Sequence, residues 1–165
     1  MLWSAPRSRS TAFFRMMAER GDFTVVHEPF SYLAELGYAD VAGERITSAA
    51  GLESQYEIFT EVSRLTGRAP VVIDSDDLIT RPAAIVQAWC TRVGIDFRPG
   101  ALTWPPADHP EWQPSRRWHA EAAASTGFAR MSAWPTVDVE RDPVLNAYLR
   151  HHLPFYERLH AQRLT

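Results

Sequence analysis

Residues 4–11 read Ser4-Ala5-Pro6-Arg7-Ser8-Arg9-Ser10-Thr11 and separate two apolar segments, 1–3 and 12–17. A turn of this composition between a strand and a helix presents free backbone N–H groups and the positive end of the helix dipole to whatever lies above it. It therefore predicts an anion site, most naturally for phosphate. Ser and Thr before an apolar segment are also ordinary N-cap residues, but a cap needs one hydroxyl and does not account for two arginines among three of them.

The elements around this turn predict a βαβ unit. We expect a helix over residues 10–20, closed by a glycine at the C′ position. Residues 23–27, FTVVH, are typical of a short buried strand that stops before a proline. Because parallel strands of a right-handed unit end at the same edge of the sheet, we expect Arg7 to lie near His27 and Glu28.

The loop at residues 6–11 resembles the P-[KR]-S-x-[ST]-T loop with which sulfotransferases hold the 5′-phosphosulfate of the donor PAPS (3′-phosphoadenosine 5′-phosphosulfate). The glycine-rich sequence G-x-x-x-x-G-K-[ST] is absent, so the sequence does not indicate an NTP hydrolase. In the family a Lys or Arg follows the proline, and hydroxyl groups complete the cradle. The resemblance implies that the donor is held by this loop, through Arg7, Ser8, Arg9, Ser10 and Thr11.

Residues 28–32, EPFSY, resemble the E-P-F/Y stretch that follows the second strand in a bacterial branch of sulfotransferases. Sulfuryl transfer to a hydroxyl requires a base for the acceptor proton and cations for the oxygens that gain charge. The resemblance implies Glu28 as the first candidate for the base, His27 as the second, and Arg7 as the catalytic cation. The same residues also allow a structural ion pair between Glu28 and Arg7 or Arg15, with His27 in the core.

The next segments keep the order of the family. Residues 52–65 have helical periodicity, and one face of this helix is expected in the core rather than in a ligand site: Tyr56, Phe59, Val62 and Leu65. Residues 70–74, PVVID, predict a central parallel strand. Asp76 and Asp77 are expected to cap the helix predicted over residues 82–93, and a catalytic role is the alternative.

Residues 99–128 predict a long Pro- and Trp-rich loop with a helix at about 115–124. The loop tryptophans are expected either to attach the loop to the domain or to stack on a purine or an aromatic acceptor: Trp104, Trp112 and Trp118. Residues 125–128, STGF, are similar to a late turn of the family. Residues 143–164 predict a C-terminal helix, kinked or interrupted at Pro154. One side of that helix is apolar and carries Leu145, Tyr148, Leu149 and His152.

One block of the family is missing from this sequence. Between the E-P-F stretch and the helix at residue 52, the family has a further strand and an R-x-P-R-x-x-x-x-S stretch that holds the donor's 3′-phosphate. Here the interval contains only Arg45-Ile46-Thr47-Ser48. An enzyme would then need replacement cations from Arg45, Arg116, Arg117 or Arg130, or from a second copy of the chain. The alternative is a non-catalytic binding or accessory protein that kept the scaffold and binds a simpler anion.

The composition is that of one globular domain over residues 1–165, with 45% hydrophobic and 22% charged residues. Neither a membrane-spanning apolar run nor a secretory leader is visible in the sequence. The lone cysteine, Cys90, is expected to be a buried thiol. We therefore expect a cytoplasmic protein. A net charge of −3 argues against nucleic acid as a partner. All 17 side chains counted as Lys or Arg are arginines, and the histidines show no metal-ligand spacing.

These observations predict an α/β fold: a three-layer domain of the P-loop type, with a short, mainly parallel sheet flanked by helices. The predicted activity is transfer of a sulfuryl group from PAPS to a hydroxyl of a small molecule. A sheet shortened by one strand exposes an edge that a second copy would cover, so we also consider a homodimer.

Overall fold

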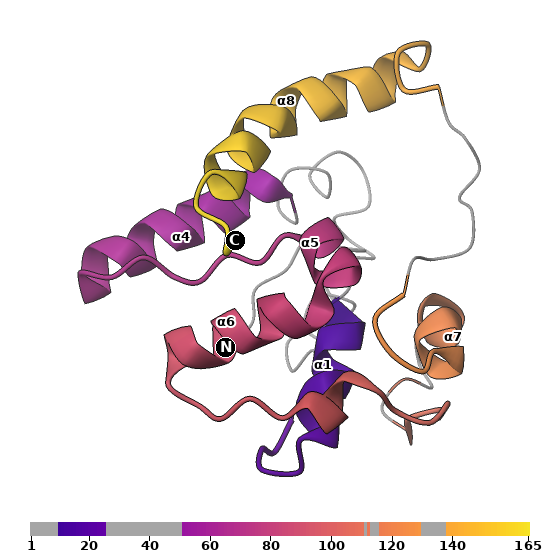
Figure 1. Cartoon of the computed structure of the whole chain (residues 1–165). Helices are drawn as coiled ribbons and strands as arrows, with labels where there is room; N and C mark the ends of the chain where they lie inside the picture. The colour runs from indigo at the N-terminus through magenta and orange to yellow at the C-terminus, as the bar shows by residue number, and fades with distance from the viewer. Residues whose placement is uncertain (1–9, 26–50, 111, 113–115, 130–137) are drawn as a thin grey trace. The chain divides into compact units, whose positions relative to one another are not determined.

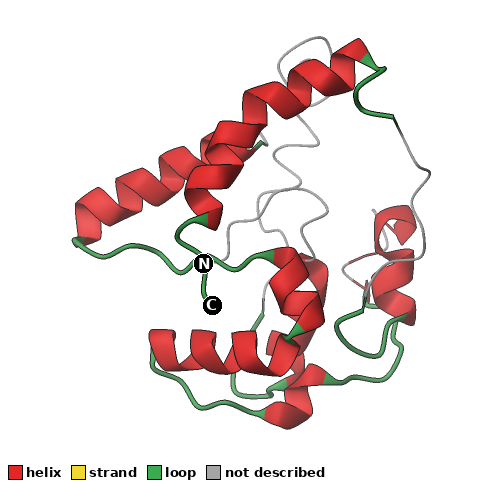
Figure 2. Ribbon diagram, turned by 45° about the horizontal axis from the view of Figure 1, so that its top comes forward, coloured by secondary structure: helices red, strands yellow, loops and turns green. Residues whose placement is uncertain are grey.

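The computed structural model describes residues 10–25, 51–110, 112, 116–129 and 138–165, and of residues 116–118 the backbone only. The chain divides into two compact units. One unit comprises residues 9–29, 75–133 and 165, and the other comprises residues 1–8, 30–74 and 134–164. Figure 1 labels the helices, and Figure 2 colours the same chain by secondary structure.

The first unit is built from helices that pack around a small apolar core. It contains helices α1 (Ser10–Glu19), α5 (Ser75–Thr80), α6 (Pro82–Val93) and α7 (Arg116–Ala124) and the 3-10 helix η1 (Pro99–Leu102). Helix α1 contacts η1 and α7, and α6 contacts α5 and η1. Met16, Ile85, Cys90 and Trp112 are almost completely buried. The core therefore joins α1 to segments that follow it by more than sixty residues in the sequence.

The helices predicted for this unit are confirmed. Gly21 after α1 and Gly94 after α6 have φ angles of 69° and 77°, a left-handed conformation that glycine adopts without strain. The N–H of Gly94 donates to the carbonyl of Cys90 at 2.9 Å and so satisfies one carbonyl at the end of α6. Asp76 and Asp77 lie in the first turn of α5, a short helix that the sequence analysis did not predict. Carboxylates there interact favourably with the helix dipole.

The second unit contains two long helices, α4 (Leu52–Thr66) and α8 (Pro143–His160), which lie side by side (Figures 1 and 2). The predicted helix over residues 52–65 is confirmed, and Gly67 closes it with a φ of 66°. Tyr56 of α4 meets Phe155 of α8 with ring centroids 6.1 Å apart. The prediction that Leu65 belongs to the core is wrong, because its side chain is 67% exposed and none of the α4 side chains is fully buried.

The C-terminal helix is shorter than predicted, and Pro154 does not interrupt it. Helix α8 starts with Pro143, and the Asp142 side chain accepts hydrogen bonds from the N–H groups of Val144 and Leu145. It ends at His160, not at residue 164. The chain then turns, and the N–H of Leu164 donates to the carbonyl of Val72 at 2.9 Å. This contact competes with continuation of the helix, because it requires an extended backbone at residues 163 and 164.

Among the described residues, the predicted sheet is present only as isolated β-bridges. Val72, in the predicted central strand, forms an isolated parallel bridge with Arg163. Residues 23–25 form a bend and irregular backbone instead of the start of a strand, and the side chain of Phe23 is 42% exposed. The rest of that predicted strand lies outside the described residues, so the α/β fold stays a prediction. No helix in the described part of the chain is long and apolar enough to cross a membrane.

Candidate functional site

The part of the predicted anion site that the structure describes is the start of helix α1. Ser10 and Thr11 are its first two residues, and both are partly exposed. The first turn of α1 carries no acidic side chain, so nothing within that turn opposes an anion at its free N–H groups. Five other predicted site residues lie outside the described residues: Arg7, Ser8, Arg9, His27 and Glu28. The predicted proximity of Arg7 to His27 and Glu28 therefore stays a prediction.

Arg15 anchors the middle of α1 with a buried guanidinium group. Its side chain is 1% exposed, and it donates hydrogen bonds to the carbonyls of Ala122, at 3.0 Å, and Pro105, at 2.5 Å. The guanidinium also lies 5.5 Å from the ring centroid of Trp104 and 6.0 Å from that of Trp112. Burial lowers the pKa of Arg15, and the charge of nearby Glu19 acts in the opposite direction. Cation–π contacts and carbonyl oxygens thus replace part of the water that this cation has lost, although its buried Nε atom has no hydrogen-bond partner among the described residues.

The tryptophans of the long loop attach it to this unit. The indole N–H of Trp104 donates to the hydroxyl of Ser125 at 3.0 Å, and its ring meets the edge of Phe128 at 5.5 Å. Trp112 is completely buried and stacks on His119 at 5.2 Å. Of the two alternatives for these residues, attachment of the loop is confirmed for Trp104 and Trp112. The side chain of Trp118 lies outside the description.

Arg20 anchors the end of α1 in a second network. It donates to both carboxylate oxygens of Asp22, at 3.1 and 3.0 Å, and to the carbonyl of Asp96 at 2.8 Å. Arg98 returns a hydrogen bond to the carbonyl of Arg20 at 2.6 Å and also pairs with Asp22 at 3.1 Å. The network therefore connects Arg20, the residue directly after α1, to the segment that follows α6.

Charge and burial shift two pKa values in this network. Desolvation acts to raise the pKa of Asp22, but the hydrogen bond from Arg20 and the charges of Arg20 and Arg98 outweigh it, so the pKa lies below its usual value. Burial raises the pKa of the Cys90 thiol, and Arg20, 3.7 Å from the sulfur, opposes that shift. Cys90 is 1% exposed, which confirms the prediction that it is a buried thiol.

These two arginines were missed by the sequence analysis as positioning residues. A signal existed for Arg15, because it is the lone charge in the apolar run 12–17. A long cation in such a place must either reach the surface or find buried acceptors. For Arg20 the sequence offers no comparable signal, since an arginine in the last turn of a helix is ordinary. Together they hold α1 at its middle and at its end.

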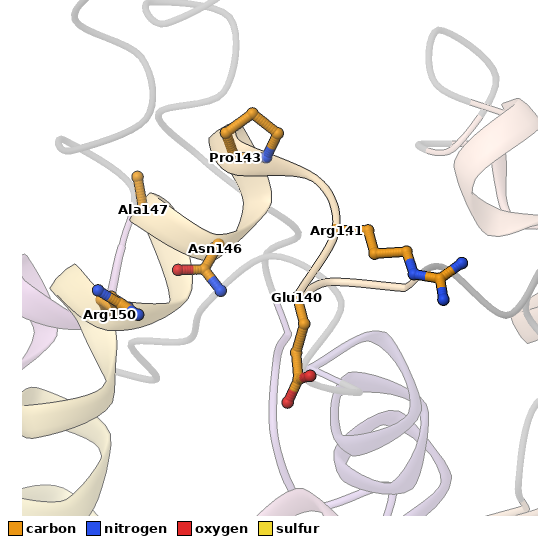
Figure 3. Close-up of a pocket in the computed structure, with 6 residues that line it drawn as sticks. All are labelled: Glu140, Arg141, Pro143, Asn146, Ala147 and Arg150. Carbon is orange, nitrogen blue, oxygen red and sulfur yellow. The ribbon is translucent and has the colours of Figure 1, made fainter.

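The second unit has polar groups of its own, at a pocket beside the start of α8. The residues that line it are Glu140, Arg141, Pro143, Asn146, Ala147 and Arg150. Figure 3 shows that Glu140 and Arg141 come from the turn before α8 and that their side chains diverge. Arg141 pairs with Asp138 at 3.1 Å. A lining of mixed charge, with a carboxylate among the arginines, does not by itself define an anion site.

Other titratable groups join the two helices of that unit. His151 of α8 lies 2.8 Å from Glu53 of α4, measured from Nε2 to Oε2. The ring of His152 is 3% exposed and lies so close to Gly51 that a Cβ atom there would come within 2.1 Å of it. No group of three metal-ligating side chains occurs in the described part of the chain.

Comparison with known proteins identifies the class to which these helices belong. A family model described as a sulfotransferase domain matches residues 53–163, the range from α4 to the bridge residue Arg163. The chain belongs to this sulfotransferase domain family, which makes it a sulfotransferase-like protein of the transferase class. The match does not include the loop at residues 6–11 or Glu28. Neither a curated protein nor a solved structure matches the chain.

Proposed function

We propose that this protein transfers a sulfuryl group from PAPS to a hydroxyl group of a small molecule. The observation that carries the proposal is the sulfotransferase domain match over residues 53–163. The loop at residues 6–11 adds support, because its last two hydroxyl residues open helix α1. A helix start with no acidic side chain in its first turn suits the phosphosulfate of the donor.

In the proposed reaction the acceptor oxygen attacks the sulfur, and the bond from sulfur to the phosphate oxygen breaks. The 3′,5′-bisphosphate leaves with the electron pair of that bond. Arg7 stabilises the charge that develops on the phosphosulfate, and the remaining residues of the loop orient it. Glu28 takes the proton of the acceptor hydroxyl, with His27 as the second candidate for this base. In this scheme Arg15 and Arg20 are positioning residues, because they hold α1 and touch neither reactant.

A second candidate function follows from the missing block between the E-P-F stretch and α4. Without that block the protein does not hold the 3′-phosphate of the donor, and the complex loses charge-assisted hydrogen bonds worth roughly 1.5–3 kcal/mol each. The chain would then be an accessory protein that binds sulfate, a mononucleotide or a diphosphate. The enzyme hypothesis requires compensating cations, for which we propose Arg45, Arg116, Arg117 or Arg130, or a second copy of the chain.

Thermal shifts with three anions distinguish the two functions. The protein is melted with adenosine 3′,5′-bisphosphate, with AMP and with sulfate. A ligand at 100 times its dissociation constant adds about 2.7 kcal/mol to the folded state. Selective stabilisation by the bisphosphate supports the enzyme, and equal weak shifts with all three anions favour the accessory protein. No shift with the bisphosphate at millimolar concentration overturns the sulfotransferase proposal.

The role of the loop is tested with Arg7→Ala, and Arg68→Ala serves as a control at an exposed arginine outside the loop. Turnover of PAPS by Arg7→Ala is expected to fall roughly 10²-fold or more, because a cation that acts in the transition state is lost. Arg68→Ala is expected to keep full turnover. Full turnover by Arg7→Ala would exclude the proposed role of the loop.

A further inference from the structure

Helix α8 carries more apolar surface than helix α4 covers. His152 and Leu159 are buried on its α4 side. Large apolar side chains along the rest of the helix remain exposed: Val144 by 73%, Leu145 by 37%, Tyr148 by 44%, Leu149 by 47%, Leu153 by 42% and Tyr156 by 40%. Large apolar side chains that are exposed together along one helix indicate an interaction site.

Four of these residues form one stripe. Leu145, Leu149, Leu153 and Tyr156 follow at intervals of four, four and three residues, which places them on one face of an α-helix. We call this face the α8 stripe. It lies beside the line of His152 and Leu159. The stripe therefore lies next to the face of α8 that packs against α4. A second helix could pack on the stripe without displacing α4.

The α8 stripe has almost the same pattern when it is read in the opposite direction. If a second copy of α8 is laid antiparallel on the first, Leu145 comes opposite the second copy's Tyr156, and Leu149 comes opposite its Leu153. Each contact then occurs twice, once on each side of a twofold axis. A surface that complements itself in this way is what an isologous dimer needs.

The charges at the ends of α8 favour the same antiparallel arrangement. The helix is preceded by Glu140 and capped by Asp142. Its last turn carries Glu157, Arg158 and His160, and Arg163 follows it, so the arginines outnumber the carboxylate at this end. Arg141, the cation at the acidic end, is paired with Asp138 at 3.1 Å. Antiparallel pairing brings the acidic end of one helix to the basic end of the other and aligns the helix dipoles favourably, whereas parallel pairing would bring like charges together.

From these observations we propose that two copies of this chain associate through antiparallel contact of their α8 stripes. A helix of 18 residues is about 27 Å long. One helix pair of this length is at the small end of specific interfaces, which bury about 800 Å² on each partner. The dimer therefore forms with a dissociation constant in the micromolar range. This association requires no nucleotide, so its test is independent of the proposed sulfotransferase activity.

The first test measures mass in solution by light scattering or sedimentation over a range of concentrations. The wild-type mass is expected to rise from 18.7 kDa towards twice that value with increasing concentration. Leu149→Glu places a charge in the stripe and is expected to keep the protein monomeric. Leu65→Glu is the matched control, because Leu65 lies on α4 and its side chain is more exposed than that of Leu149. This substitution is expected to leave the dimer intact.

Wild-type protein that stays monomeric at all concentrations overturns the proposal, as does Leu149→Glu protein that dimerises as well as Leu65→Glu. Circular dichroism and thermal unfolding are recorded for both variants. Variants are compared when they melt like the wild-type protein at the lowest concentration, where the wild-type protein is itself expected to be monomeric. If Leu149→Glu does not fold, Leu149→Ser takes its place in the same measurement.

A disulfide test checks the direction of the two helices. Leu145→Cys protein is mixed with Tyr156→Cys protein under oxidising conditions, where Cys90 is buried and does not compete. An antiparallel pair brings these positions within the 4.4–6.8 Å between Cα atoms that a disulfide needs, so the mixture is expected to form a covalent dimer. Leu145→Cys protein alone is expected to form little. Efficient cross-linking of Leu145→Cys to itself would overturn the antiparallel arrangement.

Discussion

Replacement of Arg20 by methionine tests whether the network at the end of α1 stabilises the protein. Methionine keeps much of the apolar stem of the side chain and removes the guanidinium group. The largest loss is the hydrogen bond from Arg20 to the carbonyl of Asp96, which is 2.8 Å long and made by a side chain that is 1% exposed. Asp22 is not left alone, because Arg98 still pairs with it at 3.1 Å.

The magnitude follows from this geometry. A hydrogen bond from a charged donor contributes about 1.5–3 kcal/mol, and the loss of the pair with the partly exposed Asp22 adds less. We therefore expect Arg20→Met to lower the free energy of unfolding by about 2 kcal/mol. For a chain of this size that corresponds to a decrease of roughly 4–8 °C in melting temperature.

Thermal unfolding followed by circular dichroism measures the effect, and Arg64→Met is the matched control. Arg64 also pairs with a carboxylate, Glu61 at 2.6 Å, but both side chains are more than half exposed. Exposed pairs contribute little because water solvates the separated charges nearly as well. The control is expected to melt like the wild-type protein. Equal melting temperatures for Arg20→Met and Arg64→Met would refute the argument that burial gives the Arg20 network its strength.

Three further predictions concern packing, pH and thiol reactivity. Gly51→Ala is expected to lower the free energy of unfolding by about 1–3 kcal/mol, because the new Cβ would overlap the buried ring of His152. Gly100→Ala is the control, because a Cβ at that position meets open space. Equal stability of the two variants would contradict the packing argument. The pKa of Asp22 is lowered in the folded state, so the stability that its carboxylate contributes is present above the unfolded pKa and is lost as the pH falls through the folded pKa. Asp22→Asn should remove this part of the pH dependence of the unfolding free energy, measured by urea titration. An unchanged loss of stability at acid pH in the variant would contradict the assignment. Burial raises the pKa of Cys90, so a thiol reagent should label it slowly until the protein is unfolded; rapid labelling of the folded protein would contradict its burial.

The longer helices could be predicted from local signals in the sequence, whereas the six-residue helix α5 was not predicted. Glycines at the ends of α1, α4 and α6 adopt the left-handed conformation, and prolines occupy the first positions of α6 and α8. These signals depend on residues within one turn of the helix end, so they need no knowledge of the fold. The end of α8 at His160 could not be predicted in this way, because it depends on Val72, a partner far away in the sequence.

The predicted strand at residues 70–74 shows the limit of local reasoning. Its apolar, β-branched residues favour an extended backbone, but a strand exists only where a neighbour accepts and donates its hydrogen bonds. Among the described residues the neighbour is Arg163, at Val72 alone. The candidate site has the same limit. Ser10 and Thr11 start α1 as predicted, whereas the burial of Arg15 depends on the loop at Trp104 and Trp112, which no local pattern connects to it.

The bridge between Val72 and Arg163 also has a consequence for how the protein reaches its folded state. The two residues are separated by most of the described chain, and closing so long a loop is slow compared with forming the helices between them. Until that closure, residues 70–74 are a mostly apolar segment whose N–H and C=O groups are bonded to water and not to the protein, so other unfolded chains can pair with them. Refolding yield should therefore fall as protein concentration rises, and the losses should begin at this segment.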